Sequence, residues 1–237
     1  MKKNNRPALS ATVDSAIGEK PRTEEKLNVS RKAGHPVGQS DDLSADELRK
    51  ILALPDKRKK DELRDYAVLL VLANTPMRKG ELVSLKLGNL VDEGKTQYLT
   101  YVGLKKRSKR KYWLKIPIGQ KVYEGIRRYV ESENKSAKLE HDAPLFFTLG
   151  KHGPYTKKKI TPRAIDKIVH KYVKKAGINK RITPHSFRAT YLTLRAKGHD
   201  PASLLGLSGH ASLAGLSPYL RGSEEKRREA ALSQTVV

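Results

Sequence analysis

The chain has 237 residues, no cysteine and a formal net charge of +24. Such an excess of Lys and Arg indicates a polyanionic partner, and the lack of an 18-residue apolar run or a signal peptide favours nucleic acid over a membrane surface. The absence of cysteine excludes disulfides and thiolate metal sites, which fits the cytoplasm, where we expect the protein to act.

The first part of the chain divides into a polar arm and the start of a folded domain. Residues 1–42 are basic, rich in Ser, Pro, Gly and Asn, and lack an apolar period, so they predict a disordered arm or linker ahead of one domain over residues 43–237. Ser44 and Glu47 form a capping-box pattern that predicts the start of a helix. Residues 65–74 are apolar on nearly every side, which predicts a central, buried helix.

The remaining elements predict a mainly helical domain with a small antiparallel β-hairpin sheet. Two β-prone runs flank a basic stretch and form the hairpin, and a short apolar piece further on fits a strand. In chain order the prediction comprises the hairpin strands at 98–102 and 112–116, helix 120–130, the apolar piece at 145–147, helix 161–177, a helix from 183, and helices 201–207, 211–217 and 224–231. Pro218 is expected to end the helix that precedes Tyr219.

Side chains suited to phosphoryl transfer through a covalent tyrosine ester recur in short motifs. They are Arg78 in TPMRKGEL, His185 and Arg188 in TPHSFR, and His210 and Tyr219, which stand nine residues apart. Guanidinium groups hold two phosphate oxygens at once, and an imidazole can take the proton of a phenol whose oxygen then attacks phosphorus.

In order and spacing these motifs resemble those of the tyrosine recombinase (phage integrase) family, over roughly residues 44–228. The resemblance implies the catalytic-domain fold of that family and a site-specific recombinase or integrase, as found in mobile elements. Two positions depart from the family pattern. Pro76 stands where glycine is usual, and Ala189 replaces a common histidine, but neither change removes a group that performs chemistry.

The resemblance also implies a role for each motif residue. Arg78 and Arg188 are expected to clamp the scissile phosphate, and His210 to donate a hydrogen bond to one of its oxygens. His185 is expected to receive the proton of Tyr219, the nucleophile that forms a 3′-phosphotyrosyl link. Each residue also has an ordinary alternative: an arginine paired with a nearby glutamate, or a tyrosine that only packs.

A lysine of the hairpin completes the predicted site, because the family uses one to protonate the leaving 5′-oxygen. Counting back from Pro117 favours Lys109, whereas counting forward from the first strand favours Lys105. The other cations of this stretch are read as contacts to phosphates.

The expected partner is double-stranded DNA, bound by a homo-tetramer on two duplexes, and no metal, ATP or other cofactor is expected. The family usually adds a helical N-terminal domain that grips the opposite face of DNA, so an accessory protein is a possible partner here. Two alternatives stay open: a type IB-like DNA topoisomerase, which shares the chemistry, and a noncatalytic DNA-binding protein on a degenerate recombinase fold.

Overall fold

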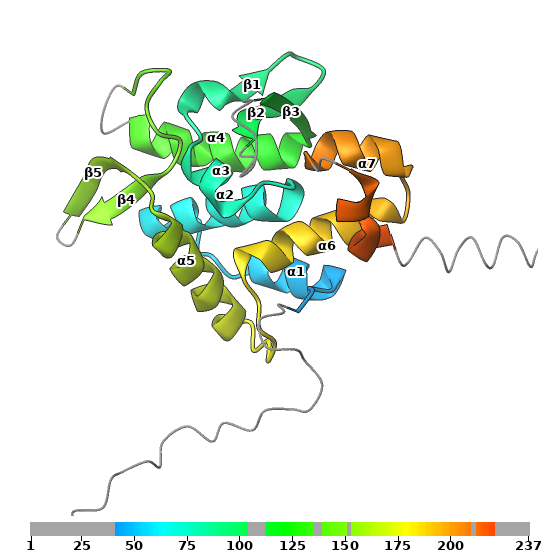
Figure 1. Ribbon diagram of the computed structural model, residues 1–237. Coiled ribbons are helices and arrows are strands. Elements are labelled where there is room, and N and C mark those ends of the chain that lie inside the picture. The colour runs from blue at the N-terminus through cyan, green and yellow to red at the C-terminus, as the bar shows by residue number, and fades with distance from the viewer. Residues whose placement is uncertain (1–40, 104–111, 135–138, 151–152, 210–211, 221–237) are drawn as a thin grey trace, which may run out of the picture. The chain divides into compact units, whose positions relative to one another are not determined.

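The computed structural model describes residues 41–103, 112–134, 139–150, 153–209 and 212–220 (Figure 1). Residues 1–40 of the predicted arm and the predicted helix 224–231 lie outside the described residues. In the described part of the chain, no helix combines the length and the apolarity needed to cross a membrane.

The mainly helical architecture with a small antiparallel sheet is confirmed (Figure 1). The helices are α1 (Ala45–Ala53), α2 (Lys60–Asn74), α3 (Lys79–Val83), α4 (Gln120–Asn134), α5 (Pro162–Lys175), α6 (Pro184–Ala196) and α7 (Pro201–Ser208), with 3₁₀ turns η1 (Leu87–Asn89) and η2 (Leu213–Gly215). The strands are β1 (Leu90–Asp92), β2 (Gln97–Gly103), β3 (Tyr112–Ile118), β4 (Phe147–Gly150) and β5 (Gly153–Lys159).

Helix α2 is central and buried, as its sequence predicts. Its residues from Ala67 to Leu72 are at most 6% exposed, and α4 and α6 both pack against it. Helix α1 begins at the predicted capping box, in which the Ser44 hydroxyl and the Glu47 carboxylate each accept a hydrogen bond from the other's backbone N–H. The packing of α6 on α2 supports the helix that carries the second arginine motif, and the first arginine motif directly follows α2 in the chain.

The predicted hairpin forms as β2 and β3, and β1 adds a third antiparallel strand in the order β1-β2-β3. A second hairpin, β4–β5, was not predicted as a pair. The sequence of β5, GPYTKKK, lacks the alternation of apolar and polar residues that marks a half-buried strand. Its antiparallel pairing with β4 is evident only from the tertiary structure.

The predicted helix over residues 211–217 is wrong over its described part, residues 212–217. The short turn η2 occupies the middle of this segment, and residues 217–220 are helical instead. Pro218 therefore stands in the first turn of a helical segment rather than after the end of one. Proline is tolerated there because the first N–H groups of a helix have no intrahelical acceptor.

Candidate active site

Helix α6 sets the positions of two predicted site residues. Thr183, at its N-cap, has an extended backbone, and Pro184 takes the first helical position. His185 and Arg188 lie on the same side of the helix, three residues apart. The side chain of His185 reaches solvent, whereas Arg188 is only 3% exposed.

The guanidinium of Arg188 is held by two backbone carbonyls from distant parts of the chain. Its Nη1 donates to the carbonyl of Pro76, and its Nη2 donates to the carbonyl of Ser208 at 2.9 Å. Pro76 precedes Arg78 by two residues, and Ser208 ends α7. The arginine thus connects α6 to the first motif and to α7. Proline in place of the family's usual glycine leaves this contact intact, because the contact uses only a carbonyl.

Arg78 stands at the N-cap of α3, where Glu81 fixes it. The carboxylate of Glu81 accepts hydrogen bonds from the backbone N–H of Arg78 at 2.7 Å and from its Nη1 at 3.1 Å. Glu81 is 1% exposed, whereas the Arg78 side chain is 40% exposed. Arg78 therefore does form the ion pair with Glu81 that its ordinary alternative describes. The same ion pair holds the partly exposed guanidinium of Arg78 in place.

Arg78, His185 and Arg188 line one pocket of about 410 Å³ formed by α3, α5 and α6. On the α5 side, an ion pair between Lys79 Nζ and Asp166 Oδ2, 2.7 Å long, borders the pocket. Two guanidinium groups and an imidazole at one pocket are suited to a phosphodiester, whose two non-bridging oxygens each accept more than one hydrogen bond.

The electrostatics of the pocket favour an anion. Burial, followed by the charge of Arg78, lowers the pKa of Arg188, and Glu81 opposes this effect. Partial desolvation of the imidazole, followed by the charges of Arg188 and Arg78, lowers the pKa of His185. The imidazole is therefore poised to be neutral near pH 7, the state in which it accepts a proton.

Tyr219 lies within electrostatic reach of both arginines. Its backbone N–H donates to the carbonyl of Leu216 at 2.8 Å, and its ring packs against a small hydrophobic cluster of α6, α7 and Leu216, separate from the main core. Burial raises the pKa of the Tyr219 phenol, whereas Arg188 and Arg78 lower it. Arg78, His185 and Arg188 thus share one pocket, and Tyr219, which is not one of its lining residues, lies near enough to feel the charge of both arginines.

The sequence model of the phage integrase family matches residues 41–226. The chain belongs to this family. It is 30% identical over 189 residues to the tyrosine recombinase XerA of Pyrococcus furiosus, which covers 79% of this chain and 59% of that protein. It is 33% identical over 169 residues to XerC of Leptospira interrogans, with 71% and 50% coverage.

The fold of this phage integrase family member also matches solved structures. The XerH site-specific recombinase, bound to its palindromic difH substrate in a post-cleavage complex, superposes with a TM-score of 0.64 at 21% identity, over 80% of this chain and 52% of that one. The chain therefore spans only between 50% and 59% of the length of these relatives.

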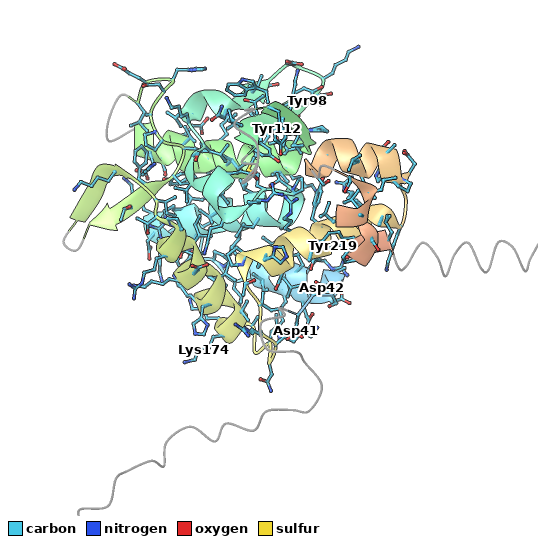
Figure 2. The ribbon with its side chains drawn as sticks, viewed as in Figure 1. Asp41, Asp42, Tyr98, Tyr112, Lys174 and Tyr219 are labelled. Atoms are coloured by element: carbon cyan, nitrogen blue, oxygen red, sulfur yellow. The ribbon has the colours of Figure 1, made fainter. Side chains whose placement is uncertain are left out.

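Asp42 is a neighbour of the site that the sequence did not indicate. The residues on either side of it are anchored: the Asp41 carboxylate accepts from the backbone N–H of Arg181 at 2.8 Å, and the N–H of Leu43 donates to the Thr190 hydroxyl at 2.9 Å. Figure 2 shows Asp42 close to Tyr219, the candidate nucleophile.

The Asp42 carboxylate acts on the titration of both groups that the proton transfer would use. It opposes the lowering of the pKa of His185 and adds to the raised pKa of Tyr219. Burial raises the pKa of Asp42 itself, whereas His185 lowers it. No sequence signal marks Asp42, because it belongs to a polar segment without a period.

Two predicted site residues, Lys109 and His210, lie outside the described residues, as does the alternative Lys105. Their roles stay predictions. Across the described ranges, no three His, Cys, Asp or Glu side chains form a group that could hold a metal ion.

Proposed function

We propose that this chain is the catalytic part of a site-specific DNA recombinase that cleaves and rejoins strands through a 3′-phosphotyrosyl intermediate. The observation that carries the proposal is the convergence of Arg78, His185 and Arg188 on one pocket, with Tyr219 in the field of both arginines. Residues from widely separated motifs meet there, although each also has an ordinary explanation when considered alone.

In the proposed reaction the Tyr219 oxygen attacks the scissile phosphorus and its proton passes to His185. The bond from phosphorus to the 5′-oxygen breaks, and a new bond to the tyrosine oxygen forms. Arg78 and Arg188 bind the non-bridging oxygens, whose charge grows in the transition state. A half-buried phenol with a raised pKa is a poor nucleophile, so a neutral base and nearby cations are both needed to activate it.

The leaving 5′-oxygen needs a proton, which we assign to a lysine of the β2–β3 segment, Lys109 ahead of Lys105. The 5′-hydroxyl of a partner duplex then reverses the step and exchanges strands. The tyrosine ester conserves the energy of the phosphodiester, so the proposed reaction uses neither a metal ion nor ATP. Double-stranded DNA is the proposed substrate, and four protomers on two duplexes are the proposed assembly.

Residues 1–40 of the predicted arm are proposed to act as a basic tether that binds DNA phosphates, and a separate partner protein is the alternative source of this contact with DNA. The net charge of +24 supports a strong electrostatic contribution to DNA binding. Deletion of residues 1–40 tests this role, with an expected decrease of about 0.9 in the log–log salt slope for each phosphate that the arm neutralises. An unchanged affinity and slope would exclude it.

The decisive experiment is detection of a covalent adduct. The protein is incubated with fragmented genomic DNA that carries its own gene, the mixture is denatured, and DNA that remains bound to protein is recovered and sequenced. The wild-type protein should give an adduct at a defined sequence, and Tyr219→Phe should bind DNA equally but give none. An adduct in that variant would assign the nucleophile to another tyrosine.

The same assay separates the alternatives. Adducts at scattered sites, with relaxation of supercoiled plasmid and no recombinant product, would favour a type IB-like topoisomerase. DNA binding without any adduct would favour a noncatalytic DNA-binding protein.

A further inference from the structure

The C-terminal end of α7 is held by side chains from two other elements. The last carbonyls of a helix have no intrahelical donor. Here the carbonyl of Ser208 accepts from Arg188 Nη2 at 2.9 Å, and the carbonyl of Gly209 accepts from the Tyr112 hydroxyl at 3.1 Å. Consecutive carbonyls are therefore bound by α6 and by β3, so both elements fix the C-terminal end of α7, which directly precedes His210 in the sequence.

Two glycines allow the close approach of the Tyr112 ring. Tyr112 pairs with Gly103 across β2 and β3, and a Cβ atom on Gly103 would lie 2.1 Å from Cζ of the ring. A Cβ on Gly209 would lie 2.6 Å from the Tyr112 oxygen. Gly209 also has φ of +63°, in the left-handed region. The ring is thus seated against one glycine and reaches the other with its hydroxyl.

The position of Tyr112 in the chain links two parts of the proposed chemistry. The residue after Gly209 is His210, the proposed hydrogen-bond donor to the phosphate. The residues just before Tyr112 form the basic stretch that includes Lys109. Figure 2 shows Tyr112 in the sheet, next to α7.

We propose that Tyr112 is a positioning residue for strand cleavage, which acts by holding the Gly209 carbonyl at the end of α7, one residue before His210 in the sequence. The inference rests on the proposed function. Tyr112 itself needs no contact with DNA, because its effect passes through the backbone at Gly209.

The test compares two variants that remove a single oxygen from the same sheet. Tyr112→Phe should slow covalent adduct formation by about three- to tenfold in a single turnover, the effect expected when one hydrogen bond is removed, without a change in DNA affinity. Tyr98→Phe is the matched control on β2, with its ring under Lys115 Nζ at 4.1 Å, and should cleave at the wild-type rate. Trp113, the single tryptophan of the chain, is 71% exposed and directly follows Tyr112, so its emission reports whether the hairpin stays intact.

A second comparison identifies the group through which Tyr112 acts. The substrate is a nicked duplex built on the sequence recovered from the adduct experiment. In a His210→Ala background, Tyr112→Phe should slow cleavage no further, because the group that it positions is gone. A 5′-thiol leaving group, which needs little protonation, should not restore the rate of Tyr112→Phe.

Each other result overturns the inference. An unchanged rate for Tyr112→Phe, full additivity with His210→Ala, or rescue by the 5′-thiol would show that the hydroxyl is idle or acts elsewhere. A wild-type protein that forms no adduct would overturn the proposed function as well, so the two failures are distinguishable.

Discussion

Gly209→Ala tests the turn before His210 from the backbone side. Alanine at φ of +63° costs about 1–2 kcal/mol, because a Cβ crowds the neighbouring carbonyl in the left-handed region. The new Cβ would also lie 2.6 Å from the Tyr112 oxygen and 3.3 Å from a methyl carbon of Leu114, so the tyrosine must move and lose its hydrogen bond, for about 1 kcal/mol more.

These costs add to about 2–3 kcal/mol at the site. If the turn must hold this geometry in the transition state, cleavage slows by about 30- to 150-fold. The assay is single-turnover adduct formation on the nicked duplex, combined with DNA affinity and thermal unfolding of each variant. We expect DNA affinity to change little, because the basic side chains proposed to bind phosphates elsewhere on the surface are untouched.

Gly177→Ala is the matched control. Gly177 follows α5 with φ of +68°, but a Cβ there would meet no atom within 4 Å. This variant should lose about 1–2 kcal/mol of folding stability and keep its cleavage rate once it is folded. Equal cleavage by wild type and Gly209→Ala, or an equal loss in Gly177→Ala, would refute the reasoning that the turn geometry serves catalysis.

Three further predictions address the remaining groups of the site. Arg188→Ala should lower the cleavage rate by more than the roughly 10²–10³-fold typical of one preorganised donor, and a loss below tenfold would make it a structural residue. Asp42→Asn removes the carboxylate that opposes the lowered pKa of His185, so the imidazole loses its proton at lower pH and the acid limb of the cleavage profile moves to lower pH. Asp41→Asn should leave the acid limb in place. The same acid limb in both variants would contradict the effect of the Asp42 charge on the pKa of His185. Lys109→Ala should be restored by a 5′-thiol leaving group, and failure of this rescue would move the general acid to another residue.

The sequence alone predicted the helices and strands that are marked by patterns of a few neighbouring residues. The capping box at Ser44, the all-round apolar α2 and the hairpin at β2–β3 were readable because helices and strands repeat their contacts at short, fixed spacings. The motifs around Arg78 and Arg188 were recognisable by their resemblance to those of the tyrosine recombinase family, and the phosphate clamp that this resemblance implies stays a prediction.

The tertiary structure decided everything that depends on contacts between distant segments. The strand β5 pairs with β4, and Pro218 lies in the first turn of the helical segment over residues 217–220 rather than after the end of a helix. Asp42 reaches the site only because its neighbours are anchored on α6 and on the segment before it. The bond from Tyr112 to Gly209 likewise joins residues with no common periodicity. A sequence records the chemistry of each side chain and its near neighbours, whereas the approach of two segments depends on the packing of the whole core between them.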